Sequence, residues 1–271
     1  MDLDLHLHSH ASDGTVSPTQ VVEHALAARL DVIALTDHDT ASGVAEARER
    51  AKGESLQVLA GIEVSCTWGE AEIHVLGYGF DPTDRAIRAH EGWAGDRRRA
   101  RMEGMVDRLR EQGLEVTMEA VRATAGSDET TLARPHLARA LEEAGYVDSS
   151  WEAFDRYIGN EHPAYIPTRL LPVEEGISLI HDAGGIAVWA HPPTEYLGEL
   201  LPVMVDAGLD GLEVYRPRTA AKKIRLLESH ARTSGLLMTG GSDWHGPERG
   251  ELGEFRLSAR EISPFLEAIG L

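Results

Sequence analysis

The sequence predicts an α/β fold in which a barrel of parallel strands carries a helical insertion. Short apolar runs typical of buried strands alternate with amphipathic helices along most of the chain, as in right-handed βαβ units. This alternation disappears between about residues 82 and 167, where only helical spacing is found. We therefore expect residues 1–82 and 167–271 to form the barrel. Residues 83–166 would form a helical insertion, or cap, over the rim that holds the active site.

The first strand and first helix are predicted from local patterns. Residues 3–7 alternate leucine with polar residues, which is the period of two expected of a strand. Side chains two residues apart on a strand share a face, so His6 and His8 should project together. The first helix should start after Ser17, where Gln20 completes a capping box.

The remaining elements of the barrel follow from apolar runs and helical spacing. Residues 66–70 should turn the chain between the third and fourth strands. The predicted strands are residues 32–35, 57–64, 72–78, 186–190, 211–215 and 236–239, and the predicted helices are residues 42–52, 172–183, 197–208, 219–234 and 263–269.

The insertion shows three helical signals. Apolar residues between Met102 and Leu109 follow the spacing of an amphipathic helix. Arg134-Pro135-His136 opens a second helix, and Ser149 with Glu152 forms a capping box before a third. The basic run from Arg97 to Arg101 is expected to be a solvated helix face.

Composition limits the possible functions. The 271 residues include 26 Lys plus Arg against 45 Asp plus Glu, a formal charge of −19, which argues against a broad basic surface for nucleic acid. A small anionic substrate remains compatible, because bound divalent cations dominate the field of a site. Cys66 is the only cysteine, so no disulfide framework or thiolate zinc cluster is expected. Without a basic apolar leader or a membrane-length apolar run, we expect a cytoplasmic protein with no membrane partner and no stable nucleic-acid complex.

Residues suited to metal binding follow one predicted strand after another. The carboxyl ends of strands in a parallel barrel share one rim, where active sites lie. His10 is close to this rim but out of phase with its strand, and we expect it to have no role. The other histidines outside the rim should be ordinary surface or helix residues; they are His24, His90, His162, His181 and His230. The rim set is His6, His8, Asp37, His38, Glu63, His74, His191, Glu213, Asp243 and His245.

The number of candidate ligands exceeds what one ion needs. Six rim histidines, together with Asp13, Glu63 and Asp243, could serve more than one ion, with Glu63 as a bridge. Two bridged ions are the usual arrangement for hydrolysis. Nitrogen and oxygen ligands without sulfur suit Zn, Mn or Fe alike. We expect His38 to be a ligand and Asp37 to orient the ligands without binding metal.

Together these motifs resemble those of the PHP (polymerase and histidinol phosphatase) family, in order and over nearly the whole chain. The resemblance implies a distorted (β/α)7 TIM-like barrel with two or three divalent ions (Mn, Zn or Fe), acting on phosphoesters. The motifs are His6-Leu7-His8-Ser9, Ser12-Asp13-Gly14, Thr36-Asp37-His38-Asp39, Gly61-Ile62-Glu63, His74, Ala190-His191-Pro192 and Ser242-Asp243-Trp244-His245.

The resemblance also implies a division of the ligands. By position, the first ion would take His6, His8, Glu63 and Asp243. A neighbouring ion would take Asp13, His38 and Glu63, and a third would take His74 and His191 with His245 shared. Family members often have histidine where Asp13 stands, so the second ion's affinity and identity are open.

The insertion resembles that of stand-alone family members that hydrolyse nucleotide phosphates, with relatives that remove nucleotides from the 5′ end of short RNA. Arg134 precedes a proline-started helix, where its guanidinium and free backbone N–H groups could receive a phosphate. A salt bridge with an acidic neighbour is the alternative. Arg216, just after the strand that ends at Tyr215, is a second candidate for phosphate.

We therefore expect a metal-dependent phosphoesterase that hydrolyses a nucleotide phosphomonoester, for example a 3′,5′-nucleotide bisphosphate to the nucleoside 5′-monophosphate. A hydroxide bridging two ions would attack, Arg134 and His136 would orient the substrate, and His191, His245 or Asp243 would protonate the leaving oxygen. Alternatives are a 5′–3′ exoribonuclease on short RNA, a histidinol-phosphate phosphatase and a non-catalytic metal-binding module. An amidohydrolase is also compatible with such ligands.

Overall fold

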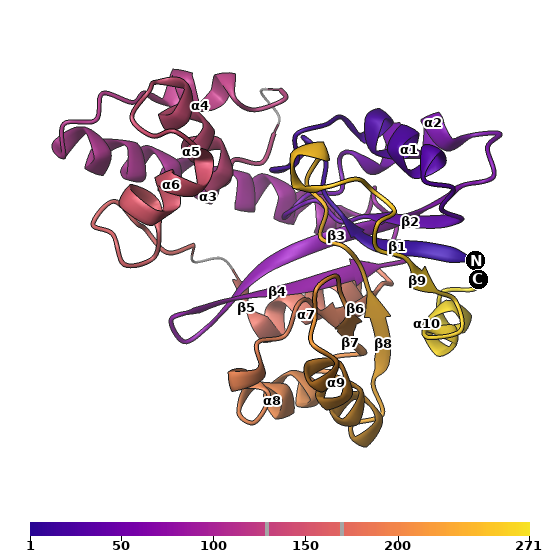
Figure 1. Cartoon of the computed structure of the whole chain (residues 1–271). Helices are drawn as coiled ribbons and strands as arrows, with labels where there is room; N and C mark the ends of the chain where they lie inside the picture. The colour runs from indigo at the N-terminus through magenta and orange to yellow at the C-terminus, as the bar shows by residue number, and fades with distance from the viewer. Residues whose placement is uncertain (128–129, 169–170) are drawn as a thin grey trace.

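A strongly curved sheet forms the centre of the protein in the computed structural model, which describes residues 1–127, 130–168 and 171–271 (Figure 1). Its strands follow the order β8-β7-β6-β4-β3-β2-β1-β9, and β5 pairs with β3. The strands are β1 (Asp2–Leu7), β2 (Val32–Leu35), β3 (Gln57–Trp68), β4 (Ala71–Tyr78), β5 (Leu171–Pro172), β6 (Ile186–Trp189), β7 (Gly211–Tyr215), β8 (Leu237–Gly240) and β9 (Leu257–Ser258).

The two ends of this sheet meet, so it is nearly closed into a barrel. The backbone N–H of Asp243, just after β8, donates to the carbonyl of His6 at 2.9 Å. The N–H of His8 donates to the carbonyl of Trp244, also at 2.9 Å. The predicted barrel-like α/β fold is therefore confirmed. Closure also brings the residues after β8 against β1, which are 235 or more positions apart in the chain.

The sheet is mixed, although parallel strands were expected throughout. β3 and β4 form an antiparallel hairpin, and β4 is also antiparallel to β6. Gly69, with φ of +60°, and Glu70 make the tight turn, and a turn of this length can join only antiparallel strands. The expectation of a turn over residues 66–70 was therefore wrong, because β3 continues to Trp68. His74 lies within β4 opposite Ser65, and not at the end of a parallel strand.

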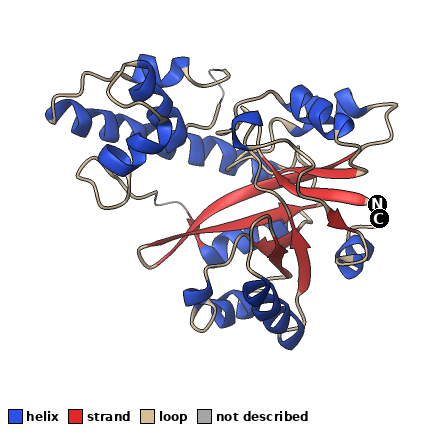
Figure 2. Ribbon diagram, in the orientation of Figure 1, coloured by secondary structure: helices blue, strands red, loops and turns tan. Residues whose placement is uncertain are grey.

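Helices cover the outside of the barrel (Figure 2). The capping box before the first helix is confirmed, with Ser17 and Gln20 each bonded to the other's backbone N–H. These helices are α1 (Pro18–Ala27), α2 (Val44–Ala51), α7 (Val173–Asp182), α8 (Leu200–Asp206), α9 (Ala221–Thr233) and α10 (Ser263–Ala268), with short turns η2 (Thr194–Tyr196) and η3 (Pro247–Arg249).

A separate group of helices projects from one side of the barrel (Figure 1). It contains α3 (Arg85–Glu111), α4 (Met118–Ala123), α5 (Arg134–Glu143), α6 (Ser150–Ala153) and η1 (Phe154–Ile158). The group has its own apolar core, which includes Met105 and Leu137, whereas Ile87 at the start of α3 is buried in the core of the barrel. Helix α3 therefore joins the two parts. Of the predicted ranges 83–166 and 167–271, residues 128–129 and 169–170 lie outside the described residues.

One expectation about α3 was wrong. Within the basic run, expected to be a solvated helix face, Arg98 and Arg101 are only 3% and 9% exposed. His90 is a helix residue of α3, which the sequence allowed, and it is 5% exposed. Helical spacing alone made the two arginines look solvated, but α3 is packed between the barrel and the other helices. None of the helices in the described ranges is long and apolar enough to cross a membrane.

Candidate metal centre

Strand β1 brings the first two candidate ligands together. His6 and His8 are fully buried, and their Nε2 atoms lie 3.1 Å apart. The two-residue spacing places both imidazoles on one face of the strand, as the sequence predicts. Asp243 follows β8 and lies beside this pair, with Oδ1 at 3.5 Å from Nε2 of His6 and 3.4 Å from Nε2 of His8.

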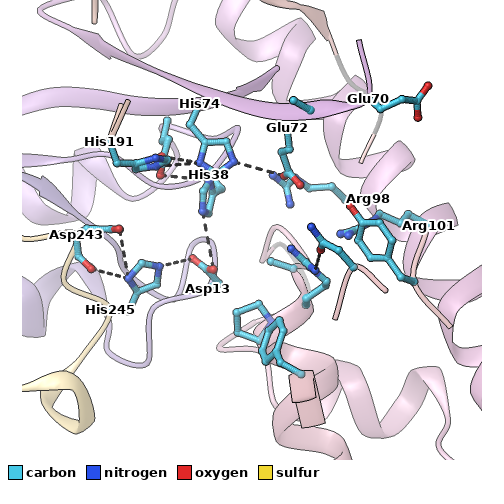
Figure 3. Close-up of a pocket in the computed structure, with 18 of the residues that line it drawn as sticks. Asp13, His38, Glu70, Glu72, His74, Arg98, Arg101, His191, Asp243 and His245 are labelled. Atoms are coloured by element: carbon cyan, nitrogen blue, oxygen red, sulfur yellow. Dashed lines mark hydrogen bonds and ion pairs between the residues drawn. The ribbon is translucent and has the colours of Figure 1, made fainter. Parts of the chain in front are cut away.

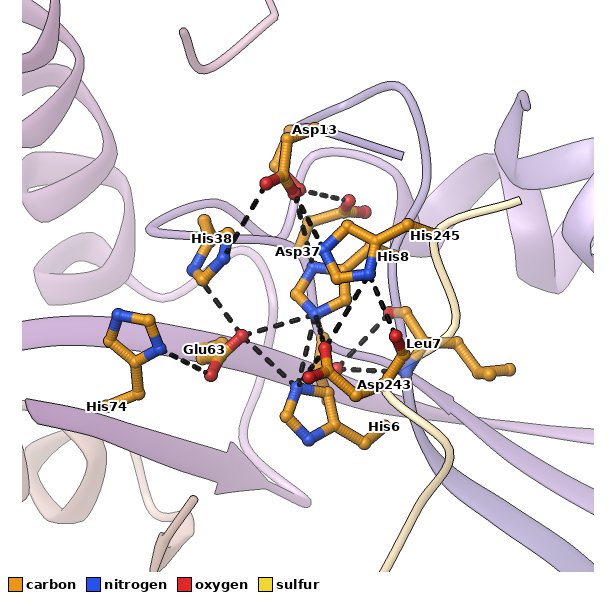
Figure 4. Close-up of polar contacts among 12 residues, drawn as sticks. His6, Leu7, His8, Asp13, Asp37, His38, Glu63, His74, Asp243 and His245 are labelled. Carbon is orange, nitrogen blue, oxygen red and sulfur yellow. Dashed lines mark hydrogen bonds and ion pairs between the residues drawn. The ribbon is translucent and has the colours of Figure 1, made fainter. Parts of the chain in front are cut away.

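Glu63 lies at the centre of the candidate ligands (Figure 4). Its Oε2 is 3.2 Å from Nε2 of both His6 and His8, and 3.4 Å from Nδ1 of His38. Its Oε1 faces other imidazoles, at 2.9 Å from Nδ1 of His74 and 3.0 Å from Nε2 of His191. Each carboxylate oxygen thus faces a different group of histidines, which is the geometry that a bridging ligand requires.

Asp13 and His245 form the other end of the cluster. Asp13 Oδ1 is 3.4 Å from Nε2 of His245 and 3.7 Å from Nδ1 of His8, and its Oδ2 is 3.9 Å from Nε2 of His38. The structure therefore groups His245 with Asp13. The family resemblance had implied that His245 belongs with His74 and His191.

Three overlapping groups have ligand atoms within 4.8 Å of one another. The first matches the set that the resemblance implies for the first ion. The groups are His6, His8, Glu63 and Asp243; His8, Asp13, His38 and His245; and His38, Glu63 and His74.

The donor set fits divalent ions. Imidazole nitrogens and carboxylate oxygens, without sulfur, converge in a buried space, and this combination suits Zn, Mn or Fe. The buried Nδ1 atoms of His8 and His38 have no hydrogen-bond partner among the described residues. An imidazole nitrogen that is buried without a partner is costly unless a cation or another group meets it.

Burial and the facing charges set the protonation states of the candidate ligands. Burial lowers the pKa of His38 to about 4, so its imidazole is neutral at pH 7. Burial alone would raise the pKa of Glu63, but the facing imidazoles of His38, His6 and His74 hold it well below its usual range. Although burial opposes it, the facing carboxylates raise the pKa of His8 and His74 to about 10 and that of His6 well above its usual range. Neutral imidazoles and ionised carboxylates are the forms that bind metal, so an ion would displace protons from these three imidazoles.

Further carboxylates hold the ligands in place. Glu213 Oε1 accepts a hydrogen bond from Nδ1 of His6 at 2.8 Å, and its Oε2 accepts from the backbone N–H of His191 at 2.7 Å. Glu72 Oε1 lies 3.4 Å from Nε2 of His74. Glu213 had been recognised at a strand end without a role, whereas Glu72 had not been singled out because its strand was assigned the wrong direction.

Asp37 supports the loop that carries Asp13. Its carboxylate accepts from the backbone N–H of Ser9 at 2.8 Å and from the hydroxyls of Ser9 and Ser12, both at 2.7 Å. Asp37 therefore lies outside the ligand groups and orients the loop after β1.

A cavity of about 550 Å³ opens between the candidate metal ligands and the projecting helices (Figure 3). On the helical side, Arg134 donates to the amide oxygen of Asn160 at 2.8 Å. Its guanidinium also lies 5.5 Å from the ring of Phe154 and 5.1 Å from the ring of Tyr165. Because Asn160 is neutral, this hydrogen bond does not neutralise the positive charge of Arg134, which lines the cavity.

Arg101 is a second cation on the wall of this cavity. Its Nε donates to the carbonyl of Ile166 at 2.6 Å, while its buried Nη2 has no hydrogen-bond partner among the described residues. Burial lowers the pKa of Arg101 to about 10, and it remains charged at pH 7. A buried guanidinium nitrogen without an acceptor is a suitable donor for a phosphate oxygen.

The other two candidate substrate-binding residues lie elsewhere. His136 is 1% exposed and caps α5, because its Nδ1 accepts from the backbone N–H of Ala133 at 3.0 Å. It does not line the cavity. Arg216 donates to Oδ2 of Asp243 at 2.7 Å, so it contacts a candidate ligand from outside the cavity.

The chain is similar to a known domain family and to several characterised enzymes that act on phosphate esters. The PHP domain family matches residues 4–121. The chain is 33% identical over 262 residues to the 3′,5′-nucleoside bisphosphate phosphatase of Chromobacterium violaceum, covering 92% of this chain and 89% of that protein. It is 33% identical over 249 residues to the 5′–3′ exoribonuclease of Haemophilus influenzae, covering 90% of each. It is 35% identical over 252 residues to the phosphoribosyl 1,2-cyclic phosphate 1,2-diphosphodiesterase of Eggerthella lenta, covering 90% and 94%.

Solved structures give the same result. A protein from Bifidobacterium adolescentis described as a metal-dependent phosphoesterase matches with a TM-score of 0.89 and 32% identity, covering 99% of this chain and 96% of that one. A Chromobacterium violaceum amidohydrolase, solved with bound sulfate and no metal, matches with a TM-score of 0.90 and 31% identity, covering 99% and 97%.

Proposed function

Because the chain belongs to the PHP family and is a metal-dependent phosphoesterase, we propose that it hydrolyses the 3′-phosphate of a nucleoside 3′,5′-bisphosphate to leave the nucleoside 5′-monophosphate. One observation carries this choice of substrate. The cavity is lined both by the candidate metal groups and by the pair Arg101 and Arg134, and each could receive a phosphate. A substrate with two phosphates would use both.

The reacting phosphate would lie at the ligand groups around Glu63. Two or three divalent ions there would supply a water of lowered pKa and neutralise charge developing on the phosphoryl oxygens. His191, Asp243 and His245 line the cavity, which supports the proposal that one of them protonates the leaving oxygen.

The non-reacting phosphate would lie at Arg101 and Arg134. The unpartnered Nη2 of Arg101 supports this assignment, as does the neutral Asn160 partner of Arg134. Phe154 and Tyr165, against which Arg134 lies, hold its guanidinium in place. Because catalysis depends on positioning, fixing one phosphate would place the other at the ligand groups.

The test is a substrate comparison with metal-replete protein. We expect the largest kcat/KM for adenosine 3′,5′-bisphosphate, with lower values for adenosine 3′-monophosphate and histidinol phosphate. His8→Ala and Asp243→Asn should abolish turnover, because each removes a candidate ligand. The proposal would be refuted if histidinol phosphate had the same kcat/KM as adenosine 3′,5′-bisphosphate. It would also be refuted if both variants kept undiminished turnover.

A 5′–3′ exoribonuclease is the second candidate, supported by the identity to the Haemophilus influenzae enzyme. The two phosphate sites could also receive neighbouring phosphates of a short RNA. The rate on a 5′-phosphorylated trinucleotide, compared with the rate on the bisphosphate, should distinguish the two candidate functions. Faster turnover of this oligomer than of the bisphosphate would favour the exoribonuclease.

A further inference from the structure

Asp39 holds the loop of His38 against strand β3. It follows His38 directly, is 1% exposed and has φ of +54°. Its N–H donates to the carbonyl of Glu63 at 2.9 Å, and its Oδ1 accepts from the N–H of Ser65 at 2.9 Å. Asp39 thus fixes the backbone that carries His38 beside the strand that carries Glu63.

Helix α3 contacts this same carboxylate through two buried side chains. Arg98 donates to Oδ2 of Asp39 from Nε at 2.8 Å and from Nη2 at 2.6 Å, and its Nη2 also contacts the Ser65 hydroxyl at 2.7 Å. His90 donates from Nε2 to Oδ1 of Asp39 at 3.0 Å. Helix α3 is therefore bonded to the residue next to a candidate metal ligand.

We propose that Arg98 is a positioning residue that couples helix α3 to the metal centre by holding Asp39, and through it the imidazole of His38. The inference rests on the proposed metal centre but not on the choice of substrate. If this is so, loss of Arg98 should lower the affinity for a metal ion that His38 binds.

The energetics of burial support this role. Removing one partner of a buried ion pair leaves an uncompensated charge, which favours movement of the remaining group toward water. Such a movement of Asp39 would disturb the loop next to His38. Arg98 also lines the cavity, but it is only 3% exposed and its hydrogen bonds are made to Asp39 and Ser65.

The position of Arg98 also relates the metal centre to the substrate site. Arg101, proposed to receive a phosphate, lies three residues further along α3 and shares a helix face with Arg98. Figure 3 shows both side chains on the same side of the cavity. One helix would therefore hold both the metal-binding loop and the non-reacting phosphate.

The test uses Mn²⁺ alone, titrated into metal-free protein with the free ion followed by electron paramagnetic resonance. Arg98→Met should lower the affinity of at least one ion by roughly 10–100-fold, as does loss of residues that orient metal ligands elsewhere. Arg99→Met is the matched control, because its side chain is exposed on the same helix and lies 3.7 Å from Asp96. The control should bind Mn²⁺ as the unmodified protein does.

A double variant distinguishes an effect of Arg98 through Asp39 from a general disturbance of the structure. If Arg98 acts through Asp39, then Asp39→Asn combined with Arg98→Met should bind Mn²⁺ no more weakly than the weaker single variant. Should Arg98→Met fail to fold by circular dichroism, Arg98→Lys with Asp39→Asn allows the same comparison. Unchanged Mn²⁺ affinity in the folded Arg98 variant, or fully additive losses, would overturn the proposal. Failure to hydrolyse nucleotides would leave this readout unaffected.

Discussion

Glu213 and His6 form a buried pair in which Oε1 of the carboxylate lies 2.8 Å from Nδ1 of the imidazole. The bond places a proton of His6 on Nδ1, so Nε2, which points toward Glu63 and His8, is the nitrogen that would bind a metal ion. Burial would raise the pKa of Glu213, but His6, to which it is bonded, holds that pKa below its usual value. Glu213 is thus an ionised acceptor that orients His6 for a metal ion.

Replacing Glu213 with glutamine should weaken metal binding. An amide has one oxygen, whereas Glu213 accepts from both Nδ1 of His6 and the N–H of His191, so one donor would lose its acceptor. We expect the affinity for Mn²⁺ to fall by roughly 10–100-fold. Glu228→Gln is the control, because Glu228 accepts from the Tyr215 hydroxyl outside the ligand groups. Equal Mn²⁺ titrations for the two variants would contradict this role.

Local patterns explain what could be predicted from the sequence. The alternation of β1 fixes the shared face of His6 and His8, and the capping box fixes the start of α1. The direction of β4 could not be predicted this way, because an apolar run has the same pattern in parallel and antiparallel strands. Only the turn at Gly69 carries information about direction, and the strand before it continues further than its pattern suggests.

The environment of α3 could not be predicted either. Arg98 is part of a charged run that reads as solvated, and the partner that makes its burial possible, Asp39, lies 59 residues away in the sequence. Glu72 was missed for a related reason, since its contact with His74 depends on the direction of β4. The residues that support the candidate ligands are thus set by tertiary contacts. Most of the candidate ligands themselves lie at or just after strand ends, but Glu63 and His74 lie within β3 and β4.

The arginine pair should determine the preference for a second phosphate. Arg134→Met should reduce kcat/KM for adenosine 3′,5′-bisphosphate by about 10–100-fold, because a charge-assisted hydrogen bond is worth about 1.5–3 kcal/mol. Turnover of adenosine 3′-monophosphate, which lacks the second phosphate, should change little. Arg156→Met is the control in the same group of helices, since Arg156 pairs with Glu152. An equal loss on both substrates would show that Arg134 does not bind the non-reacting phosphate.

The approach of β8 to β1 should depend on Gly241. A Cβ atom added there would lie 2.3 Å from Cβ of His6 and 2.5 Å from its backbone nitrogen. Gly241→Ala should therefore lower the free energy of unfolding of the metal-free protein by about 1–3 kcal/mol, the usual cost of overpacking. It should also weaken Mn²⁺ binding by displacing His6. Gly198→Ala, whose Cβ would have no neighbour within 4 Å, is the control for urea unfolding. Similar stability of the two variants would argue against a close approach.

His136 should make the stability of the protein fall as pH decreases. Burial lowers its pKa to about 4, from an ordinary value of 6.5, and its Nδ1 must be unprotonated to accept from the N–H of Ala133. Between pH 6.5 and about 4 the unfolded chain therefore binds a proton that the folded chain does not, so acidification favours unfolding. The full effect is on the order of 3 kcal/mol.

His136→Gln tests this contribution, because glutamine at this helix position can still cap the N–H of Ala133 but does not titrate. Urea unfolding of both proteins in a metal chelator, at pH 7 and at pH 4, gives the change in their difference. Relative to the unmodified protein, the free energy of unfolding of the glutamine variant should rise by on the order of 3 kcal/mol as the pH falls from 7 to 4. The other titrating groups are common to both proteins and cancel in this difference. Parallel pH profiles would mean that His136 takes up its proton equally well in the folded and unfolded states.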